Sequence, residues 1–399
     1  MGPALKLLHL ADLHLGKRVN EISMLEDQKY ILGQILDLAQ AEKSDAVLIA
    51  GDVYDKGVPP GDAVELLDEF LTRLARMGLP VLCIAGNHDS PERLGFGSRL
   101  FARSGLHIAG TFTGSVQHDT LRDAWGPVNF YLLPFVRPAA VAPCFPQETI
   151  RTCGDAVRAA LAAAVSAPDF RPQERNVLLA HQFVTAGGNE PERSDSESVS
   201  VGGLDNVDAS LFDAFDYVAL GHLHGPQRIG RDTVRYAGSP LRYSFSEVRQ
   251  HKSVPLVELG PKGTVGYRLL PLRPVREMRQ IRGPLAALLE AGRALTEGRE
   301  DYIRALLTDE NETQVFDAVG QLRRVYPNLM RLEFENGGRG AQAQEDPAAE
   351  PEEMERLGPL GLFERFYRLQ NGRGLAGGQQ RILRGLLDRS EPAGEEGPQ

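Results

Sequence analysis

The sequence has few cysteines, and their placement is unlike that of a disulfide framework. Three cysteines occur among the 399 residues, Cys83, Cys144 and Cys153, and they form no C-x-x-C pair. Cys83 lies inside the apolar run "VLCIA". Buried free thiols are typical of a reducing compartment. We therefore expect a cytoplasmic protein.

Long apolar runs are also missing. The opening "MGPALKLLHLADLHLG" is interrupted by Lys6, His9, Asp12 and His14 too early for the core of a signal peptide. No other run is long enough to cross a bilayer. The expectation is that the protein has no membrane segment.

An excess of positive charge is the third absence. The formal net charge is -10, which argues against broad electrostatic attraction to phosphate backbones. Nucleic-acid binding would need local positive charge, metal ions or a basic partner. The length, by contrast, allows one large domain and one or two smaller ones.

Short apolar runs recur and indicate buried strands. They occupy residues 5–10, 46–50, 81–85, 177–180 and 217–220. Between the first three lie two stretches with apolar residues at helical spacing, 26–43 and 62–77. The alternation predicts a layered α/β core. Residues 226–272 show strand-like pieces between Gly and Pro turns, which indicates a second, mostly antiparallel part of the same core.

The remaining chain predicts four further segments after a core domain over residues 1–274. Residues 275–336 suit a small α+β domain. Residues 337–358 are rich in Gly, Ala, Pro and acids, which is typical of a flexible linker. Residues 359–390 carry two apolar helical stripes, and 391–399 are expected to be a disordered tail.

Each apolar run ends in residues that can bind a metal ion. The ends carry Asp12 and His14, then Asp52, then Asn87 and His88, then His181, and finally His222 and His224. Ligand sites in α/β sheets form at the carboxyl ends of the strands, so we expect these side chains to converge. The glycines before Asp52, Asn87 and His222 are expected to let the backbone turn sharply.

The residue types indicate which metals such a site would hold. Asp, His and Asn without thiolate suit Mn, Fe or Zn better than Mg or Ca. Seven ligands are too many for one ion and suit two ions that share a carboxylate, for which Asp52 is the natural candidate. Two ions roughly 3.5–4 Å apart can act on both oxygens of an in-line phosphoryl displacement.

The motifs D-x-H, G-D-x-x-D, G-N-H-D, H and G-H-x-H occur in this order, and the chain thereby resembles the calcineurin-like metallophosphoesterases. More narrowly, "HLADLHLGK", "GDVYDKGVPP", "GNHDSPERL", "SDSESVSVGG" and "GSPLRYSFSE" are similar to nuclease subunits that process DNA double-strand breaks in bacteria. The resemblance covers nearly the whole chain. It implies a core of two packed sheets flanked by helices, with a small α+β capping domain and a C-terminal helix pair.

The resemblance also implies roles for the site residues. One ion would be held by Asp12, His14, Asp52 and His224, and the other by Asp52, Asn87, His181 and His222, with Mn²⁺ as the expected metal. His88 would face the scissile phosphate and protonate or stabilise the leaving oxygen, and Asp89 would orient its imidazole. Some related nucleases have a histidine where Asp55 stands, so Asp55 is expected only to hold the loop.

The partners follow from the resemblance in the same way. They are DNA, a coiled-coil ATPase subunit and a second copy of the chain, paired through helices near 61–77 and 91–103. The ATPase would bind Leu362, Phe366, Leu383 and Leu386 of the helix pair and bring the nuclease to the nucleoid. The alternative is that the helices pack on the chain's own core, against which the acidic linker argues.

These observations predict a manganese-dependent DNA nuclease, a 3′ to 5′ exonuclease on double-stranded ends and an endonuclease on single strands or hairpins. One alternative is a phosphodiesterase or nucleotidase for small substrates, which would not need the small domain or the helix pair. Another is a scaffold that has lost its chemistry, against which the complete set of ligands argues.

Overall fold

The computed structural model describes residues 4–188, 190–197, 205–309, 317–335, 359–371, 374–375 and 377–390. The chain divides into two compact units, Met1–Met278 and Arg279–Gln399. In the described part of the chain, no helix has both the length and the apolar character needed to cross a bilayer.

The first unit is built on two six-stranded sheets. One sheet has the order β16 (Val265–Pro271), β15 (Ser253–Leu259), β1 (Leu5–Leu10), β4 (Ala46–Ala50), β5 (Val81–Ile84) and β6 (Leu106–Ala109). The other has the order β13 (Gln227–Ile229), β14 (Arg231–Tyr236), β12 (Tyr217–Gly221), β9 (Arg175–His181), β8 (Gly126–Leu133) and β7 (Gln117–Asp123).

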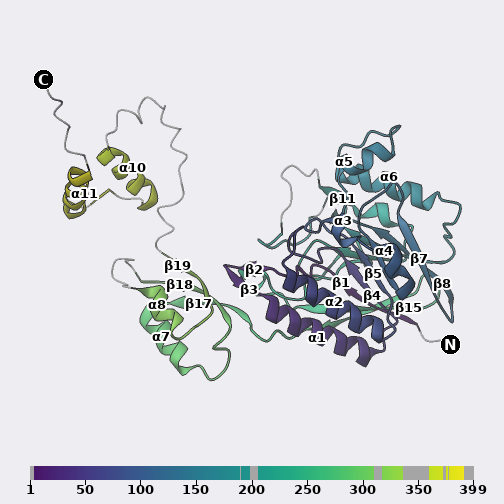
Figure 1. Ribbon diagram of the computed structural model, residues 1–399, viewed down its shortest axis with the longest axis horizontal. Helices are drawn as coiled ribbons and strands as arrows, with labels where there is room; N and C mark the ends of the chain where they lie inside the picture. The colour runs from purple at the N-terminus through teal and green to yellow at the C-terminus, as the bar shows by residue number, and fades with distance from the viewer. Residues whose placement is uncertain are drawn as a thin grey trace. The chain divides into compact units, whose positions relative to one another are not determined.

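The sheets pack face to face and helices cover their outer sides (Figure 1). Leu7, Leu48 and Leu82 of the first sheet meet Phe130 and Leu179 of the second in one buried cluster. Helices α1 (Leu25–Glu42) and α2 (Gly61–Arg76) lie on one side, and α5 (Pro138–Val141) and α6 (Cys153–Val165) on the other. This is the predicted layered α/β core.

The central strands are parallel, and β4, β5, β9 and β12 are buried at every position. β1, β4, β5 and β6 are successive parallel neighbours, as are β8, β9 and β12. Continuous apolar runs are typical of strands covered on both faces, which explains why the sequence marked β1, β4, β5, β9 and β12 so clearly. All five end at the same region of the molecule, where the polar residues begin.

The sequence of residues 226–272 had suggested one mostly antiparallel part of the core. The later strands instead divide between the two sheets. β13 and β14 extend the second sheet, and β14 is parallel to β12. β15 and β16 extend the first sheet as an antiparallel hairpin beside β1. Without these strands, β1 and β12 would be sheet edges with unpaired backbone groups, so the chain covers each edge in turn.

Short elements complete this unit. They are β2 (Arg18–Val19), β3 (Ile22–Ser23), α3 (Pro91–Leu94), α4 (Ser98–Phe101), β10 (Phe183–Thr185), β11 (Asn206–Asp208) and four 3₁₀ turns, the last of them Phe245–Glu247. The three cysteines are free, two of them buried.

The second unit contains a three-stranded sheet, β17 (Met278–Gly283), β18 (Tyr302–Leu307) and β19 (Leu329–Phe334), with helices α7 (Leu285–Ala294) and α8 (Ala318–Arg323). Its core joins Leu288, Ile303, Leu322 and Tyr326. Residues 310–316 of this small domain lie outside the described part.

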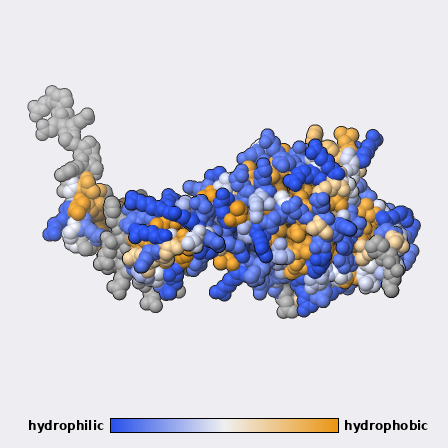
Figure 2. Space-filling model, turned by 90° about the horizontal axis from the view of Figure 1, so that it is seen from below, coloured by the Kyte–Doolittle hydropathy of each residue, from blue (hydrophilic) through white to orange (hydrophobic). Residues whose placement is uncertain are grey.

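Two helices follow, α10 (Pro359–Asn371) and α11 (Gly377–Ser390), linked by a hydrogen bond from Gln380 Nε2 to Glu364 Oε1 (2.9 Å). Leu362, Phe363, Ile382 and Leu386 are exposed, and Figure 2 shows hydrophobic patches among hydrophilic side chains on the molecular surface. The side chain of Phe366, the linker 337–358 and the tail 391–399 lie outside the described residues.

Candidate metal centre

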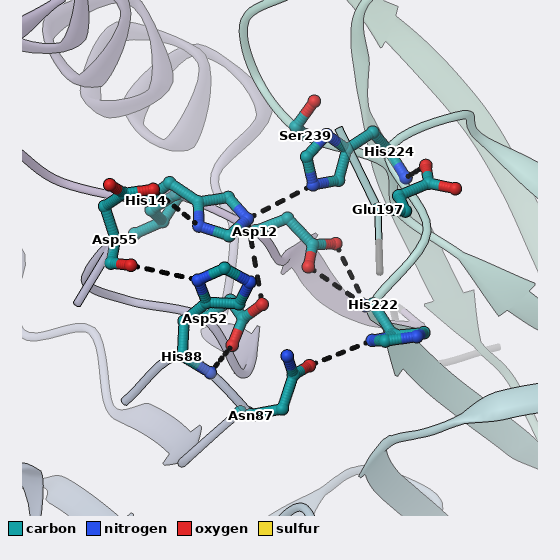
Figure 3. Close-up of polar contacts among 12 residues, drawn as sticks. Asp12, His14, Asp52, Asp55, Asn87, His88, Glu197, His222, His224 and Ser239 are labelled. Atoms are coloured by element: carbon teal, nitrogen blue, oxygen red, sulfur yellow. Dashed lines mark hydrogen bonds and ion pairs between the residues drawn. The ribbon is translucent and has the colours of Figure 1, made fainter. Parts of the chain in front are cut away.

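The predicted ligands meet where loops from both sheets converge (Figure 3). The first sheet supplies Asp12, His14, Asp52 and Asn87 from the loops after β1, β4 and β5. The second sheet supplies His181 at the end of β9 and His222 and His224 after β12. Hydrogen bonds and short polar contacts connect all seven residues into one cluster. The polar centre therefore joins the two sheets.

One part of the cluster contains Asp12, His14 and His224, with a possible ligand atom of each within 4.8 Å of the others. The Nε2 atoms of His14 and His224 lie 3.1 Å apart. Two unprotonated ring nitrogens would repel at this distance, so a proton or a cation must lie between or beside them. The position is suited to a metal ion.

A second part contains Asp12, Asp52 and His181, again within 4.8 Å of one another. The Asn87 side-chain oxygen lies 3.0 Å from His181 Nε2 and 2.9 Å from His222 Nδ1. Asp52 Oδ2 lies 3.3 Å from His181 Nε2 and 3.7 Å from His14 Nε2. Asp52 thus lies between the two parts, and Asp12 is near both.

Several of these residues have a backbone conformation that is rare for side chains other than glycine. Asp12, His14, Asp52 and His222 have φ values of 53°, 45°, 49° and 106°. Such conformations cost about 1–3 kcal/mol each and persist only where the surroundings enforce them. Here Asp12 N donates to Gly51 O (3.0 Å) and His14 N donates to Asp52 O (2.9 Å). The loops hold the ligands in place before any ion binds.

The glycines in these loops are needed, but for two different reasons. Gly51 has a φ of 90°, and a Cβ there would lie 2.4 Å from His181 Nδ1. Gly86 and Gly221 do not have positive φ, so the expected sharp turn is not their role. A Cβ on Gly86 would lie 2.1 Å from Asp52 Oδ1, and one on Gly221 would lie 2.0 Å from Ala50 O. Gly86 and Gly221 allow the backbone to lie close to Asp52 and to Ala50.

Burial and mutual charge set the protonation of the cluster. Burial raises the pKa of Asp12 to about 7 against the opposing effect of His181 and His224. Burial alone would lower the pKa of His181, but the Asp52 and Asp12 carboxylates raise it to about 9. In the metal-free chain a protonated His181 therefore compensates Asp52. A divalent cation can take over this compensation, and carboxylates, imidazoles and an amide oxygen fit it.

His88 adjoins this cluster, and with His14 and Asp55 it forms a third group whose possible ligand atoms lie within 4.8 Å of one another. Its backbone N–H donates to Asp52 Oδ1 (2.9 Å), and its ring Nδ1 lies 2.9 Å from the carbonyl oxygen of Asp55. A carbonyl oxygen only accepts, so a neutral His88 ring carries its proton on Nδ1 and leaves Nε2 free. The half-buried ring lies edge-on to His14.

The expected contact between Asp89 and the His88 ring is replaced by another arrangement. The Asp89 carboxylate accepts hydrogen bonds from the N–H groups of Val53 (3.1 Å), Tyr54 (2.9 Å) and Gly86 (2.8 Å). Adjacent side chains point in different directions here, and Asp89 is turned towards the loop amides. The Asp55 carbonyl orients His88, while Asp89 fixes the loop that carries Asp52.

Asp55 also contacts the centre through its side chain. Its carboxylate lies 2.6 Å from Lys17 Nζ and 3.6 Å from His14 Nδ1. His9 is buried between the sheets with Nδ1 2.9 Å from the Tyr217 hydroxyl. These contacts hold the loop after β1 and its strand.

Sequence reasoning missed a group of residues behind His224. Glu247 Oε1 lies 3.1 Å from His224 Nδ1, and Glu197 Oε1 accepts from His224 N (2.6 Å). Lys252 Nζ donates to Glu247 Oε2 (2.6 Å). The only signal was that "SDSESVSVGG" and "GSPLRYSFSE" resembled family segments, which gave no role to any one residue.

Comparison with known proteins agrees with this geometry. A family model described as calcineurin-like phosphoesterase matches residues 5–226, the stretch that contains all seven candidate ligands. The chain belongs to the calcineurin-like phosphoesterase family. Family membership and the candidate metal-binding groups support a phosphoesterase that uses divalent metal ions.

Further similarities of this calcineurin-like phosphoesterase extend beyond the core. A model described as type 5 capsule protein repressor C-terminal domain matches residues 274–371. The SbcD subunit of the nuclease SbcCD from Staphylococcus epidermidis is 34% identical over 332 residues, covering 82% of this chain and 85% of that protein. The crystal structure of a dimetal phosphatase from Danio rerio has a TM-score of 0.40 and 13% identity, covering 67% of this chain and 96% of that one.

Proposed function

We propose that this phosphoesterase is a DNA nuclease, a 3′ to 5′ exonuclease on double-stranded ends and an endonuclease on single strands or hairpins. It would act with the coiled-coil ATPase SbcC in double-strand break repair. The proposal rests mainly on 34% identity to the SbcD subunit of a nuclease SbcCD over 82% of this chain. The clustered candidate ligands support it, because they suit phosphodiester hydrolysis.

The centre would hold two divalent cations, with Mn²⁺ as the proposed metal. Asp12, His14, Asp52 and His224 would hold one, and Asp52, Asn87, His181 and His222 the other. When bound, such ions neutralise charge on the phosphodiester and lower the pKa of water. The donor set contains no thiolate, which fits manganese.

The chain's own residues would complete the reaction. His88 presents Nε2 beside the centre, and we propose that, when both ring nitrogens carry protons, Nε2 gives its proton to the leaving oxygen and the ring returns to the form protonated on Nδ1. The Asp55 carbonyl keeps the ring in this orientation through Nδ1 (2.9 Å). Asp89 keeps the Asp52 loop in place through the backbone amides of Val53 and Tyr54.

The experiment that tests this function combines metal content with cleavage. The purified chain should bind two manganese ions and cut a hairpin DNA only when the metal is present. Asp52→Ala should lose both ions, whereas His14→Ala and His224→Ala should each chiefly lose one, because only a bridging carboxylate contacts two ions. Mass spectrometry of the native proteins measures this.

Two results would contradict the proposal. Loss of a single ion in all three variants would refute the bridging role of Asp52. Hydrolysis of a small phosphodiester without cleavage of any DNA, in the presence of the ATPase partner, would favour the small-substrate alternative.

Exposed apolar surfaces support both proposed protein partners. Leu362, Phe363, Ile382 and Leu386 on α10 and α11 are suited to a groove on SbcC. Val64 on α2 and Phe96, Leu100 and Phe101 around α3 and α4 are also exposed. These flank an apolar pocket lined by Leu67, Leu71 and Leu94. We propose that this second surface pairs two copies of the chain.

A further inference from the structure

A buried chain of polar groups lies behind His224, on the side away from the other candidate ligands. The Glu247 side chain is 0% exposed and that of Lys252 is 4% exposed. Lys252 Nζ contacts Glu247 Oε2 at 2.6 Å, Ser239 Oγ at 2.8 Å and the His224 carbonyl oxygen at 2.9 Å. A fourth acceptor, Gln250 Oε1, lies 2.8 Å from the same ammonium group. Lys252 therefore holds one Glu247 oxygen and the His224 backbone together.

The second oxygen of Glu247 faces the His224 ring. Oε1 lies 3.1 Å from His224 Nδ1 and accepts from the Ser196 hydroxyl at 2.6 Å, and the Ser196 oxygen also lies 2.9 Å from Nδ1. An ionised carboxylate can only accept hydrogen bonds, so Nδ1 must donate. The neutral ring then has its lone pair on Nε2, the atom that lies 3.1 Å from His14 Nε2 in the cluster.

We propose that Glu247, anchored by Lys252, is a positioning residue that fixes the tautomer and ring orientation of His224 and so presents Nε2 to a divalent cation. The inference rests on the proposed function, because it takes His224 as a metal ligand. A carboxylate behind a ligating histidine also makes the imidazole a better donor. Glu247 would act through His224 without touching substrate or metal.

The effect should be confined to one of the two ions, because the other histidines are held differently. His181 Nδ1 lies 2.7 Å from the Ala50 carbonyl oxygen, a neutral acceptor. His14 Nδ1 lies 3.6 Å from Asp55 Oδ1, which is too far for a hydrogen bond. Among the four candidate histidines, all of them described, His224 is the one whose Nδ1 has a carboxylate oxygen within hydrogen-bond distance, since His222 Nδ1 faces the Asn87 amide oxygen. The ion that it binds should depend on Glu247.

A purely structural role for the Glu247–Lys252 pair predicts something different. Buried ion pairs can often be replaced by apolar residues of similar volume without loss of stability. Glu247→Leu combined with Lys252→Met removes both charges and leaves neither unpaired. If the pair served only packing, this double variant would keep both metal sites.

The test is calorimetric titration of manganese into the metal-free chain. Glu247→Gln and the double variant should bind one of two ions 10–100-fold more weakly and the other as the wild type does. A second readout needs no metal. Nitrogen NMR of labelled histidine should show His224 with its proton on Nδ1 in the wild type and a mixture of tautomers in both variants.

Two further variants serve as comparisons. Asp216→Asn weakens another buried carboxylate, which accepts from Lys262 Nζ (2.8 Å) and from Asn176 N (2.7 Å) away from the centre. It should lower the unfolding midpoint but keep both ions and the His224 tautomer. Ser196→Ala should shift metal affinity less than threefold, because Glu247 remains as the acceptor.

Three outcomes would overturn the inference. The first is wild-type affinity for both ions in the double variant. The second is equal weakening of both ions, which indicates a general disturbance. The third is a tautomer change in Ser196→Ala as large as that in Glu247→Gln. If His224→Ala itself keeps both ions, the assignment of His224 as a ligand in the proposed function is wrong. If His224→Ala loses an ion but the double variant does not, only the role of Glu247 is wrong.

Discussion

His88 Nδ1 lies 2.9 Å from the carbonyl oxygen of Asp55, so a backbone group rather than a side chain sets the direction of this imidazole. Replacing His88 with Gln should therefore lower kcat by about 10²–10⁴-fold, the range for a lost proton donor. Metal content should remain at two ions, because only the His88 backbone contacts Asp52. His118→Gln, at a half-exposed surface pair with Asp169, is the control. Loss of metal in His88→Gln would instead make it a ligand.

Two glycines give a matched pair of stability tests. Gly51→Ala should lower the unfolding free energy by about 1–3 kcal/mol and weaken metal binding, because φ is 90° and a Cβ would lie 2.4 Å from His181 Nδ1. A Cβ on Gly33 in α1 would have no neighbour within 4 Å, so Gly33→Ala should raise the unfolding free energy by about 0.4–1 kcal/mol. Urea unfolding with and without manganese measures both. The prediction would be contradicted if Gly51→Ala bound metal as the wild type does and had the same unfolding free energy.

His9 should make the first unit less stable in mild acid. Burial lowers its pKa to about 3, whereas the unfolded chain takes up the proton near 6.5. Between these values the unfolded state binds more protons, so stability is full above pH 6.5 and falls as the pH falls towards 3.

The non-titrating variant His9→Gln isolates this effect. Its deficit in unfolding free energy relative to the wild type should shrink by about 2 kcal/mol from pH 7 to pH 5. Denaturant unfolding at both values measures it. A deficit that stays constant with pH would mean that His9 titrates normally in the folded chain.

The C-terminal helices should be needed for the ATPase and dispensable for the centre. A chain ending at residue 358 should keep its melting temperature, bind two manganese ions and cut short single-stranded DNA. Capture by SbcC should fall sharply. Leu386→Glu should reproduce that loss, because it would bury an unpaired charge at the contact. Exposed Arg384→Gln is the control. A lower melting temperature of the truncated chain would indicate that these helices pack on the core of the rest of the chain.

The surface around Phe96 and Leu100 should hold two copies together. At micromolar concentration the chain should sediment at twice 43.7 kDa. Leu100→Glu together with Phe101→Glu should yield monomers with two ions still bound, since neither residue adjoins the centre. A monomeric wild type would rule out this interface at that concentration.

The parts of the molecule that could be predicted are those whose burial is evident from an apolar run in the local sequence. The strand Ala46–Ala50 is apolar at every position, and Asp52 follows it directly. By contrast, β7 has the sequence "QHDTLRD" and lies at a sheet edge, so it carries no apolar run that could reveal it. β8 follows it closely and was missed with it.

The candidate ligands that directly follow a strand could be predicted from the sequence. The residues that reach the site through contacts between distant segments could not. Glu247 and Lys252 lie 23 and 28 residues after His224 and reach it only through the folding of the last strands. Asp89 was expected to act on its neighbour His88, but two amides from the Asp52 loop and one from its own loop donate to its carboxylate. Neither spacing nor residue type shows such contacts.

The division of the ligands between the two sheets has a consequence for the protein's biosynthesis. Asn87, the last ligand from the first sheet, is translated 94 residues before His181. At ordinary elongation rates the ribosome needs on the order of ten seconds to cover that distance. A nascent chain with only Asp12, His14, Asp52 and Asn87 offers four of the seven candidate ligands and one of their four imidazoles. The full set exists only after His224 has been translated, so a product interrupted earlier lacks part of the centre.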